Sequence, residues 1–108
     1  MSESQRFGTL EIAFDDRVLR PREWTTGQSR WAAELLLDQA PAGPVLELCS
    51  GAGQIGLLAI AGSDRSLVCV DANQVACEFA RANAHAAGLA DCVDVREGRL
   101  EECLERVC

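Results

Sequence analysis

The stretch PVLELCSGAGQIG, residues 44–56, decides the fold of this chain. Its apolar start predicts a buried strand, its glycines predict a tight turn, and its end predicts the beginning of a helix. A second apolar strand, LVCVD at residues 67–71, ends on the acid Asp71. Glycines allow close approach of the backbone to a ligand, a helix N-terminus offers free N–H groups, and an acid after the second strand accepts from ribose hydroxyls. The two stretches together therefore predict a site for a nucleoside-bearing cofactor.

Upstream of this stretch, the sequence predicts a small hairpin and a helix. Residues 9–14 alternate, with Leu10, Ile12 and Phe14 on one face, Asp15-Asp16 supplies a turn, and residues 17–20 are the return strand, so residues 9–20 are expected to form the hairpin. Ser29 is predicted to be the N-cap of a helix over residues 30–39. Three side chains of this helix are expected to face the core: Trp31, Leu35 and Leu36.

Downstream, helices alternate with strands. The helix expected over residues 53–61 is apolar all round, so it should be covered on more than one side. Asn73 is predicted to cap a helix that closes at Gly88, followed by a third strand at 92–96 and a short helix over 100–107. The apolar face expected for the Asn73-capped helix consists of Val75, Phe79, Ala82 and Ala86. Alternation of this kind is typical of α/β folds with a parallel sheet.

Composition limits the class of protein. The 108 residues are 48% hydrophobic and fit a single domain, which we divide into the hairpin and helix of residues 1–43 and the cofactor fold of residues 44–108. A net charge of −7 leaves no large basic surface for phosphate binding. No apolar run approaches the roughly 20 residues that span a bilayer, and the polar N-terminus does not resemble a signal peptide. The sequence predicts no membrane partner and a cytoplasmic location.

The six cysteines are expected to be reduced, and no metal site is predicted. No CxxC pair occurs, and several cysteines fall on expected strands or apolar faces, where cysteine behaves as a small hydrophobic residue.

Two cofactor classes fit the glycine turn. The spacing Gly51-x-Gly53-x-x-Gly56, followed by Asp71, formally satisfies the dinucleotide fingerprint. Three features favour S-adenosyl-L-methionine instead. Glu47 is a carboxylate within the first strand that suits a cationic aminoacyl group, the hairpin and helix precede that strand, and Asp71 is followed by Ala72 and a helix cap.

These motifs resemble those of a known family. Residues 45–53, VLELCSGAG, look like the first motif of class I S-adenosylmethionine-dependent methyltransferases, and residues 70–73, VDAN, look like the second. Residues 20–25, RPREWT, resemble the segment that precedes the fold in release-factor glutamine methyltransferases and related small-domain methyltransferases. The resemblance covers roughly residues 17–100. It implies the N-terminal half of a Rossmann-like methyltransferase fold, with an incomplete parallel sheet in the order 3-2-1.

The resemblance also implies roles for individual residues. The turn would lie along the methionine and ribose of the cofactor, Asp71 would accept both ribose hydroxyls, and Glu47 would orient the aminoacyl end. Thr25 and Gln28 would approach the methionine carboxylate. The cofactor-binding residues that we predict are Glu47, Cys49, Ser50, Gly51, Ala52, Gly53, Asp71, Ala72, Thr25 and Gln28.

The chain departs from the family at two places. Gly98-Arg99 places an arginine where the family often has an acid or amide near the adenine, so adenine recognition is left open. The catalytic Asn-Pro-Pro-aromatic motif is absent, and no catalytic residue is predicted. We expect a truncated methyltransferase that acts by N-methylation of a protein glutamine or nucleic acid, with a small-molecule acceptor also open.

Two other functions stay open: an NAD(P)-binding oxidoreductase fragment and a non-catalytic cofactor-binding or interaction module. In the family's full fold, a fourth strand pairs with the first. Its absence predicts an exposed apolar edge on the first strand, which would recruit a second copy or the remainder of the same protein.

Overall fold

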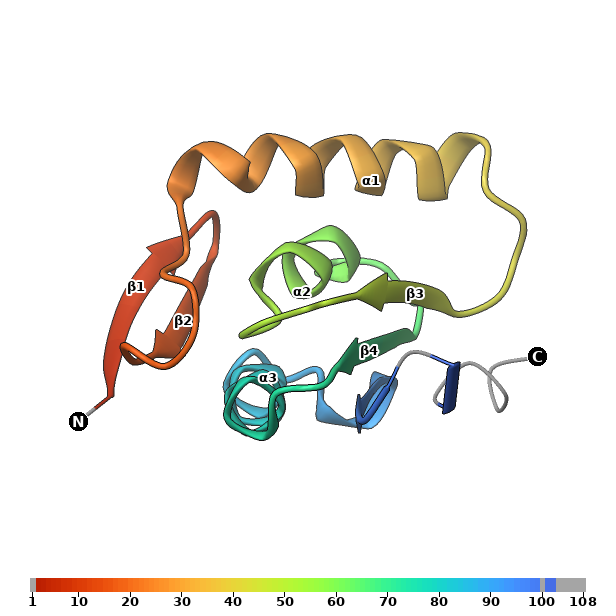
Figure 1. The fold of residues 1–108 in the computed structure, drawn as a ribbon. Helices are drawn as coiled ribbons and strands as arrows, with labels where there is room; N and C mark the ends of the chain where they lie inside the picture. The colour runs from red at the N-terminus through yellow and green to blue at the C-terminus, as the bar shows by residue number, and fades with distance from the viewer. Residues whose placement is uncertain (1, 100, 103–108) are drawn as a thin grey trace.

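The computed structural model describes residues 2–99 and 101–102. A parallel sheet, three α-helices and an antiparallel hairpin make up this part of the chain (Figure 1). The helix expected over residues 100–107 lies outside the described residues, apart from its second and third positions. None of the helices in the described ranges is long and apolar enough to cross a membrane.

The hairpin differs from the one expected. Strand β1, Glu3–Phe7, pairs antiparallel with β2, Leu10–Phe14, and Phe7 faces Leu10 across the turn. Gly8 has a φ of 61°, the left-handed conformation that a two-residue hairpin turn requires. The predicted return strand over residues 17–20 is wrong. The Arg17 N–H instead donates to the Asp15 carboxylate at 2.9 Å, which turns the chain away from β2.

Helix α1, Thr26–Asp38, begins earlier than the sequence suggested, directly after a 3-10 turn at Glu23–Thr25. Ser29 therefore lies inside the helix, and its prediction as the N-cap is wrong. It is buried, and its hydroxyl donates to the Ile55 carbonyl at 2.8 Å, which joins α1 to the next helix. Trp31 is 65% exposed, so it does not face the core as predicted, whereas Leu36 packs against the core.

The parallel sheet confirms the predicted strand order 3-2-1. Strand β3, Val45–Leu48, pairs with β4, Leu67–Asp71, and β4 pairs with β5, Val93–Glu97. A 3-10 turn at Ala90–Cys92 precedes β5. Among the described residues β3 is an edge strand, because its only strand partner there is β4.

Helices α2, Gln54–Ile60, and α3, Gln74–Ala86, follow β3 and β4. The Asn73 side chain accepts from the Val75 and Ala76 N–H groups, which confirms it as the cap of α3. The apolar face predicted for α3 is wrong for Ala82 and Ala86, which are exposed, although Phe79 is partly buried and packs against the core. The side that is buried carries smaller residues and one amide: Ala76, Cys77, Ala80, Asn83 and Ala84.

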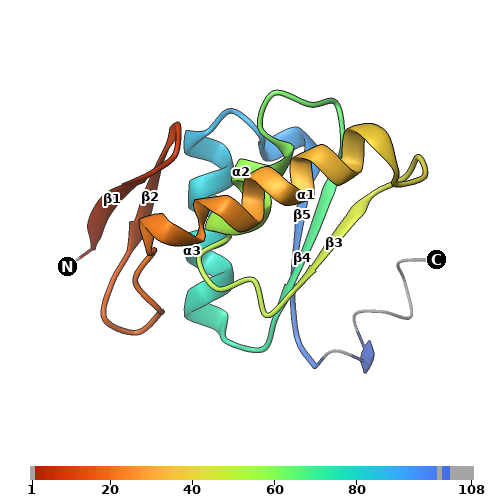
Figure 2. The ribbon, with the colours of Figure 1, turned by 90° about the horizontal axis from the view of Figure 1, so that it is seen from above.

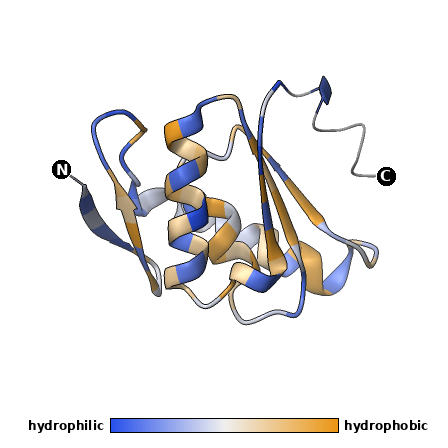
Figure 3. Ribbon diagram, turned by 90° about the horizontal axis from the view of Figure 1, so that it is seen from below, coloured by the Kyte–Doolittle hydropathy of each residue, from blue (hydrophilic) through white to orange (hydrophobic). Residues whose placement is uncertain are grey.

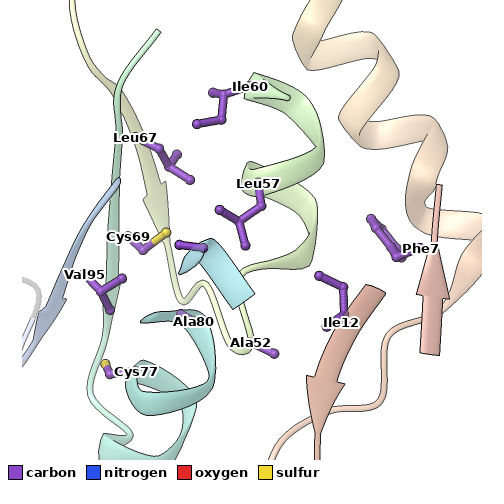
Figure 4. Packing of buried hydrophobic residues seen from close by; sticks show 11 residues of the cluster. Phe7, Ile12, Ala52, Leu57, Ile60, Leu67, Cys69, Cys77, Ala80 and Val95 are labelled. Atoms are coloured by element: carbon purple, nitrogen blue, oxygen red, sulfur yellow. The ribbon is translucent and has the colours of Figure 1, made fainter. Parts of the chain in front are cut away.

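The helices α2 and α3 lie between the sheet and the hairpin, and α1 packs across α2 (Figures 1 and 2). As expected, α2 is covered on more than one side. Figure 4 shows the consequence for the core: Leu67 and Val95 of the sheet meet α2 and α3 on one side, while Phe7 and Ile12 of the hairpin lie on the other. The hairpin is therefore part of the same core as the cofactor fold.

The two faces of the sheet are covered differently. Leu67 and Cys69 of β4 point into the core beneath the helices, whereas Val68 and Val70 form a separate cluster. Leu46 and Leu48 pair with these two valines in register and are 38% and 46% exposed. Apolar residues dominate β3 and β4 in Figure 3, whereas β1 is mostly polar and α3 alternates between polar and apolar positions.

Candidate functional site

The turn after β3 adopts a backbone conformation that few side chains tolerate. Cys49, Gly51 and Gly53 have φ values of 54°, 57° and 86°, all in the left-handed region. The Gly53 N–H donates to the Ser50 carbonyl at 2.9 Å, and the Ser50 N–H reaches the Val70 carbonyl of β4 at 3.2 Å. The turn is thus tied to the neighbouring strand at the carboxyl edge of the sheet.

The structure brings Asp71 and the glycine turn together, as the two motifs predicted. One carboxylate oxygen of Asp71 accepts from the Gly51 N–H at 2.9 Å, and the other accepts from the Asn73 N–H at 2.9 Å. Each carboxylate oxygen has a second lone pair for a ligand. Asp71 therefore holds the turn and presents acceptors beside it.

A cleft of about 420 Å³ opens at this point. Its first wall consists of the glycine turn and the start of α3, represented by Cys49, Gly51, Asp71, Asn73 and Ala76. Its second wall is the loop that leaves the hairpin, residues 16–19, which we call the hairpin loop. A cleft of this volume is in the usual range for small-molecule sites.

Sequence reasoning missed the hairpin loop because it assigned residues 17–20 to a strand. The loop is held by Asp15, whose carboxylate accepts from the Arg17 backbone and from Arg17 Nε at 3.0 Å. The Asn73 amide also reaches the Arg17 carbonyl at 3.5 Å, so the cap of α3 contacts the loop. The sequence did predict a turn at Asp15-Asp16, because aspartates favour turns, but that predicted turn ended too early.

Glu47 points away from the cleft, towards α2. A Cβ atom built on Gly56 would lie 2.3 Å from Glu47 Oε1, so the carboxyl group occupies the space that the glycine leaves. The Gly56 N–H and the Cys69 thiol donate to Glu47. Burial raises the pKa of Glu47 to about 7, although the Gly56 N–H favours the charged form. Glu47 is not among the residues that line the cleft.

The raised pKa of Glu47 predicts a pH-dependent stability. The folded chain holds a proton that the unfolded chain, with a glutamate pKa of 4.5, releases at lower pH. The free energy of unfolding should therefore fall as the pH rises from about 4.5 to about 7, by on the order of 3 kcal/mol from this group. We expect Glu47→Gln to remove this decline when urea unfolding is measured across that range. The exposed Glu34→Gln is the control, and an unchanged pH slope in Glu47→Gln would contradict the assignment.

The remaining predicted site residues lie around the turn. Ser50 and Ala52 are buried within it, and Ala72 is exposed next to Asp71. The Thr25 hydroxyl donates to the Arg22 carbonyl at 2.6 Å, and Gln28 is exposed in the first turns of α1. Neither Thr25 nor Gln28 lines the cleft. The Ser29–Ile55 bond nevertheless places this part of α1 beside the first turn of α2.

Two further groups bear on the site. Arg99, at the expected adenine side, is exposed and pairs with Glu101 at 3.0 Å. Asn83 of α3 is buried, and its amide donates to the Ala52 carbonyl of the glycine turn at 2.9 Å. Sequence reasoning missed Asn83 because a polar residue in a helix gives no signal of a partner 31 positions away.

Solved structures resemble this chain over most of its length. A SAM-dependent methyltransferase from Agrobacterium tumefaciens is 19% identical with a TM-score of 0.78, covering 97% of this chain and 35% of that one. The Pyrococcus abyssi tRNA (uracil-54, C5)-methyltransferase, in complex with S-adenosyl-L-homocysteine, is 17% identical with a TM-score of 0.73, covering 91% and 24%. An RNA methyltransferase from Salinibacter ruber, with the same ligand, is 25% identical with a TM-score of 0.62, covering 78% and 52%.

The chain thus spans between about a quarter and a half of the length of these structures. A comparison with curated proteins found no match. The model of the methyltransferase small domain family matches residues 27–106, which include the glycine turn, Asp71 and all three parallel strands. The chain therefore belongs to the methyltransferase small domain family.

Proposed function

We propose that this chain forms the S-adenosyl-L-methionine-binding part of a methyltransferase. The observation that carries the proposal is the Asp71 carboxylate, fixed 2.9 Å from the Gly51 N–H on the wall of the cleft. Membership of the methyltransferase small domain family supports it. The proposal is also supported by two of the similar solved structures, which are complexes with S-adenosyl-L-homocysteine.

The residues of the cleft fit such a cofactor. No atom lies within 4 Å of a Cβ built on Gly51, so this backbone position borders open space in the cleft. We propose that Asp71 accepts hydrogen bonds from the ribose hydroxyls, and that the turn from Cys49 to Gly53 lies along the methionine and ribose of the cofactor. Ala72 would lie beside the nucleoside, and Thr25 and Gln28 would approach the methionine carboxylate from α1.

The structure suggests a modified role for Glu47. Because its carboxyl group lies beneath α2 and binds the Gly56 N–H, we propose that it supports the aminoacyl end of the cofactor through the first turn of α2. Burial, and to a smaller extent the charge of Asp71, raises the pKa of Glu47 and keeps it neutral more readily than an exposed acid, although the Gly56 N–H and the Cys69 thiol favour its charged form. The positively charged aminoacyl end of a bound cofactor would favour the charged form of Glu47.

The chemistry divides between the cofactor and the protein. The cofactor supplies a methyl group already activated by its sulfonium, so the protein chiefly positions the acceptor atom. No Pro-Pro pair occurs in the 108 residues, and no substitute for the family's acceptor motif is evident. We propose N-methylation of a protein or nucleic-acid acceptor by the complete enzyme. With a net charge of −7, this chain would contribute little to binding nucleic-acid phosphates.

Titration of the full chain with S-adenosyl-L-homocysteine and with NAD tests the proposal. We expect micromolar binding of S-adenosyl-L-homocysteine in calorimetry and no measurable binding of NAD, because the chain belongs to the methyltransferase small domain family and two similar solved structures hold S-adenosyl-L-homocysteine. Binding of NAD alone would overturn the proposal and favour the oxidoreductase alternative.

The missing acceptor motif favours a second candidate, a cofactor-binding module that performs no catalysis by itself. Methyl transfer to any acceptor by this chain alone would refute that candidate. A cytoplasmic location and pairing through the edge of β3 stay predictions of the sequence.

A further inference from the structure

Asn83 links three parts of the molecule that are distant in sequence. It lies in the last turns of α3 and is 1% exposed. Its Oδ1 accepts from the Ala13 N–H at 2.7 Å, and its Nδ2 donates to the Ala13 carbonyl at 3.0 Å and to the Ala52 carbonyl at 2.9 Å. Both amide donors are therefore used, and all the partners are main-chain groups.

At Ala13 the amide acts as a neighbouring strand would. Strand β2 pairs with β1 along one edge, and the structure shows no other strand beside it in the described residues. By giving and receiving one hydrogen bond at the same residue, Asn83 satisfies the free edge of β2 at its fourth position. The hairpin is thereby fixed to α3 by directional bonds as well as by the contacts of Phe7 and Ile12 in the core.

At Ala52 the amide holds the cofactor turn from behind. The Ala52 carbonyl lies between the two left-handed glycines, Gly51 and Gly53, and the Ala52 side chain is buried. A side chain at Gly53 would contact Ala80 of α3 at 3.3 Å, so turn and helix are already close at this point. The bond from Asn83 fixes the orientation of the peptide group that follows Ala52.

The hydrogen bonds of Asn83 to Ala13 and to Ala52 connect the opposing walls of the cleft. Gly51 and Asp71 belong to one wall, and the hairpin loop, which begins three residues after Ala13, forms the other. A shift of the hairpin relative to α3 would move the wall formed by the hairpin loop. It would also disturb the bond from Asn83 to Ala52, which holds the glycine turn in the opposite wall. The buried amide of Asn83 therefore helps to set the distance between the walls, together with the Asn73–Arg17 contact and the core packing of the hairpin.

We propose that Asn83 is a positioning residue of the cofactor site, which sets the glycine turn against the hairpin loop. The proposal rests on the proposed function in so far as it concerns cofactor affinity, but its geometric part does not require a ligand. Removal of the amide should loosen the glycine turn and the end of β2 together, because both lose a partner in the same step. A residue that only filled the core would lower global stability without this paired local effect.

The test compares Asn83→Ala with Ile60→Ala in the full chain. Ile60 is fully buried in the same core but lies at the far end of α2, away from the cleft. Both variants are studied at a temperature where circular dichroism shows them folded. If Asn83→Ala does not fold, Asn83→Ser, which keeps a short hydroxyl, replaces it in every measurement.

Hydrogen exchange gives the readout that needs no ligand. We expect the amides of Ala13, Gly51 and Gly53 to exchange at least about tenfold faster in Asn83→Ala relative to the Cys69 amide of the central strand β4, with no such selective change in Ile60→Ala. Uniform acceleration of all four amides, or none at the turn, would overturn the proposal.

Calorimetry with S-adenosyl-L-homocysteine gives the second readout. We expect about tenfold weaker binding in Asn83→Ala and less than a twofold change in Ile60→Ala. Equal losses in both variants would overturn the role in affinity. If the unaltered chain does not bind this ligand, the proposed function fails, and the exchange pattern alone decides whether Asn83 positions the turn.

Discussion

Replacing Asp71 with alanine should weaken binding of S-adenosyl-L-homocysteine by about 10- to 100-fold, because a hydrogen bond to a charged acceptor is worth roughly 1.5–3 kcal/mol. The variant loses the acceptors assigned to the ribose. It also frees the Gly51 N–H, which Asp71 binds at 2.9 Å, so the turn becomes less ordered before the ligand arrives. Isothermal titration calorimetry of the full chain measures the effect.

Two companion variants separate the causes. Asp71→Asn keeps the size of the side chain but has a single acceptor oxygen for the Gly51 and Asn73 N–H groups. Its affinity for S-adenosyl-L-homocysteine should therefore lie between that of the unaltered chain and that of Asp71→Ala. Asp91→Ala removes a charge at an exposed position in the 3-10 turn before β5 and should bind as the unaltered chain does. A change of less than twofold in Asp71→Ala would remove Asp71 from the site.

Gly56→Ala should destabilise the fold by about 1–3 kcal/mol, the usual cost of overpacking a filled core. This reverses the ordinary effect, since alanine normally stabilises a helix interior relative to glycine. The new methyl group would lie 2.3 Å from Glu47 Oε1 and 3.0 Å from Leu67 Cδ2, and Leu67 is fully buried in the core. Urea unfolding near pH 5 measures the difference while Glu47 is largely protonated.

The chain offers a matched control for this substitution. Gly27 also lies in a helix, but nothing lies within 4 Å of a Cβ built on it, so Gly27→Ala should stabilise the fold by roughly 0.5–1 kcal/mol. Combining Gly56→Ala with Glu47→Ala should cost less than the sum of the two single changes, because removal of the carboxyl group makes room for the methyl. Strict additivity would show that Glu47 and Gly56 do not share this space.

Local signals in the sequence were sufficient to predict the strands and helices of residues 44–97. The strands at 45–48, 67–71 and 93–97 are short apolar runs between turn residues, and Asn73 caps its own helix, so each could be predicted from neighbouring residues. The pairing of Asp71 with the glycine turn followed from their places at the carboxyl ends of two adjacent strands.

The errors arose where a distant partner decides the conformation. The polar strand Glu3–Phe7 has no apolar periodicity, and it pairs with β2 because Gly8 allows the tight turn. Ser29 looks like a helix cap, yet its hydroxyl has a better partner in α2. On α3 the predicted face included Ala82 and Ala86, which are exposed, whereas the close packing of helix and turn selects Asn83 and small residues on another side. Glu47 was predicted from its place in the strand, but the direction of its carboxyl group depends on Gly56.

The main-chain partners of Asn83 have a consequence for how this chain tolerates sequence change. The amide binds the N–H and carbonyl of Ala13 and the carbonyl of Ala52, and every amino acid other than proline supplies those groups. Position 13 can therefore drift to any non-proline residue that fits the space, and position 52 to any small one, without loss of the link. Position 83 has no such freedom, so substitutions in a mutational library should be depleted there far more than at either of its partners.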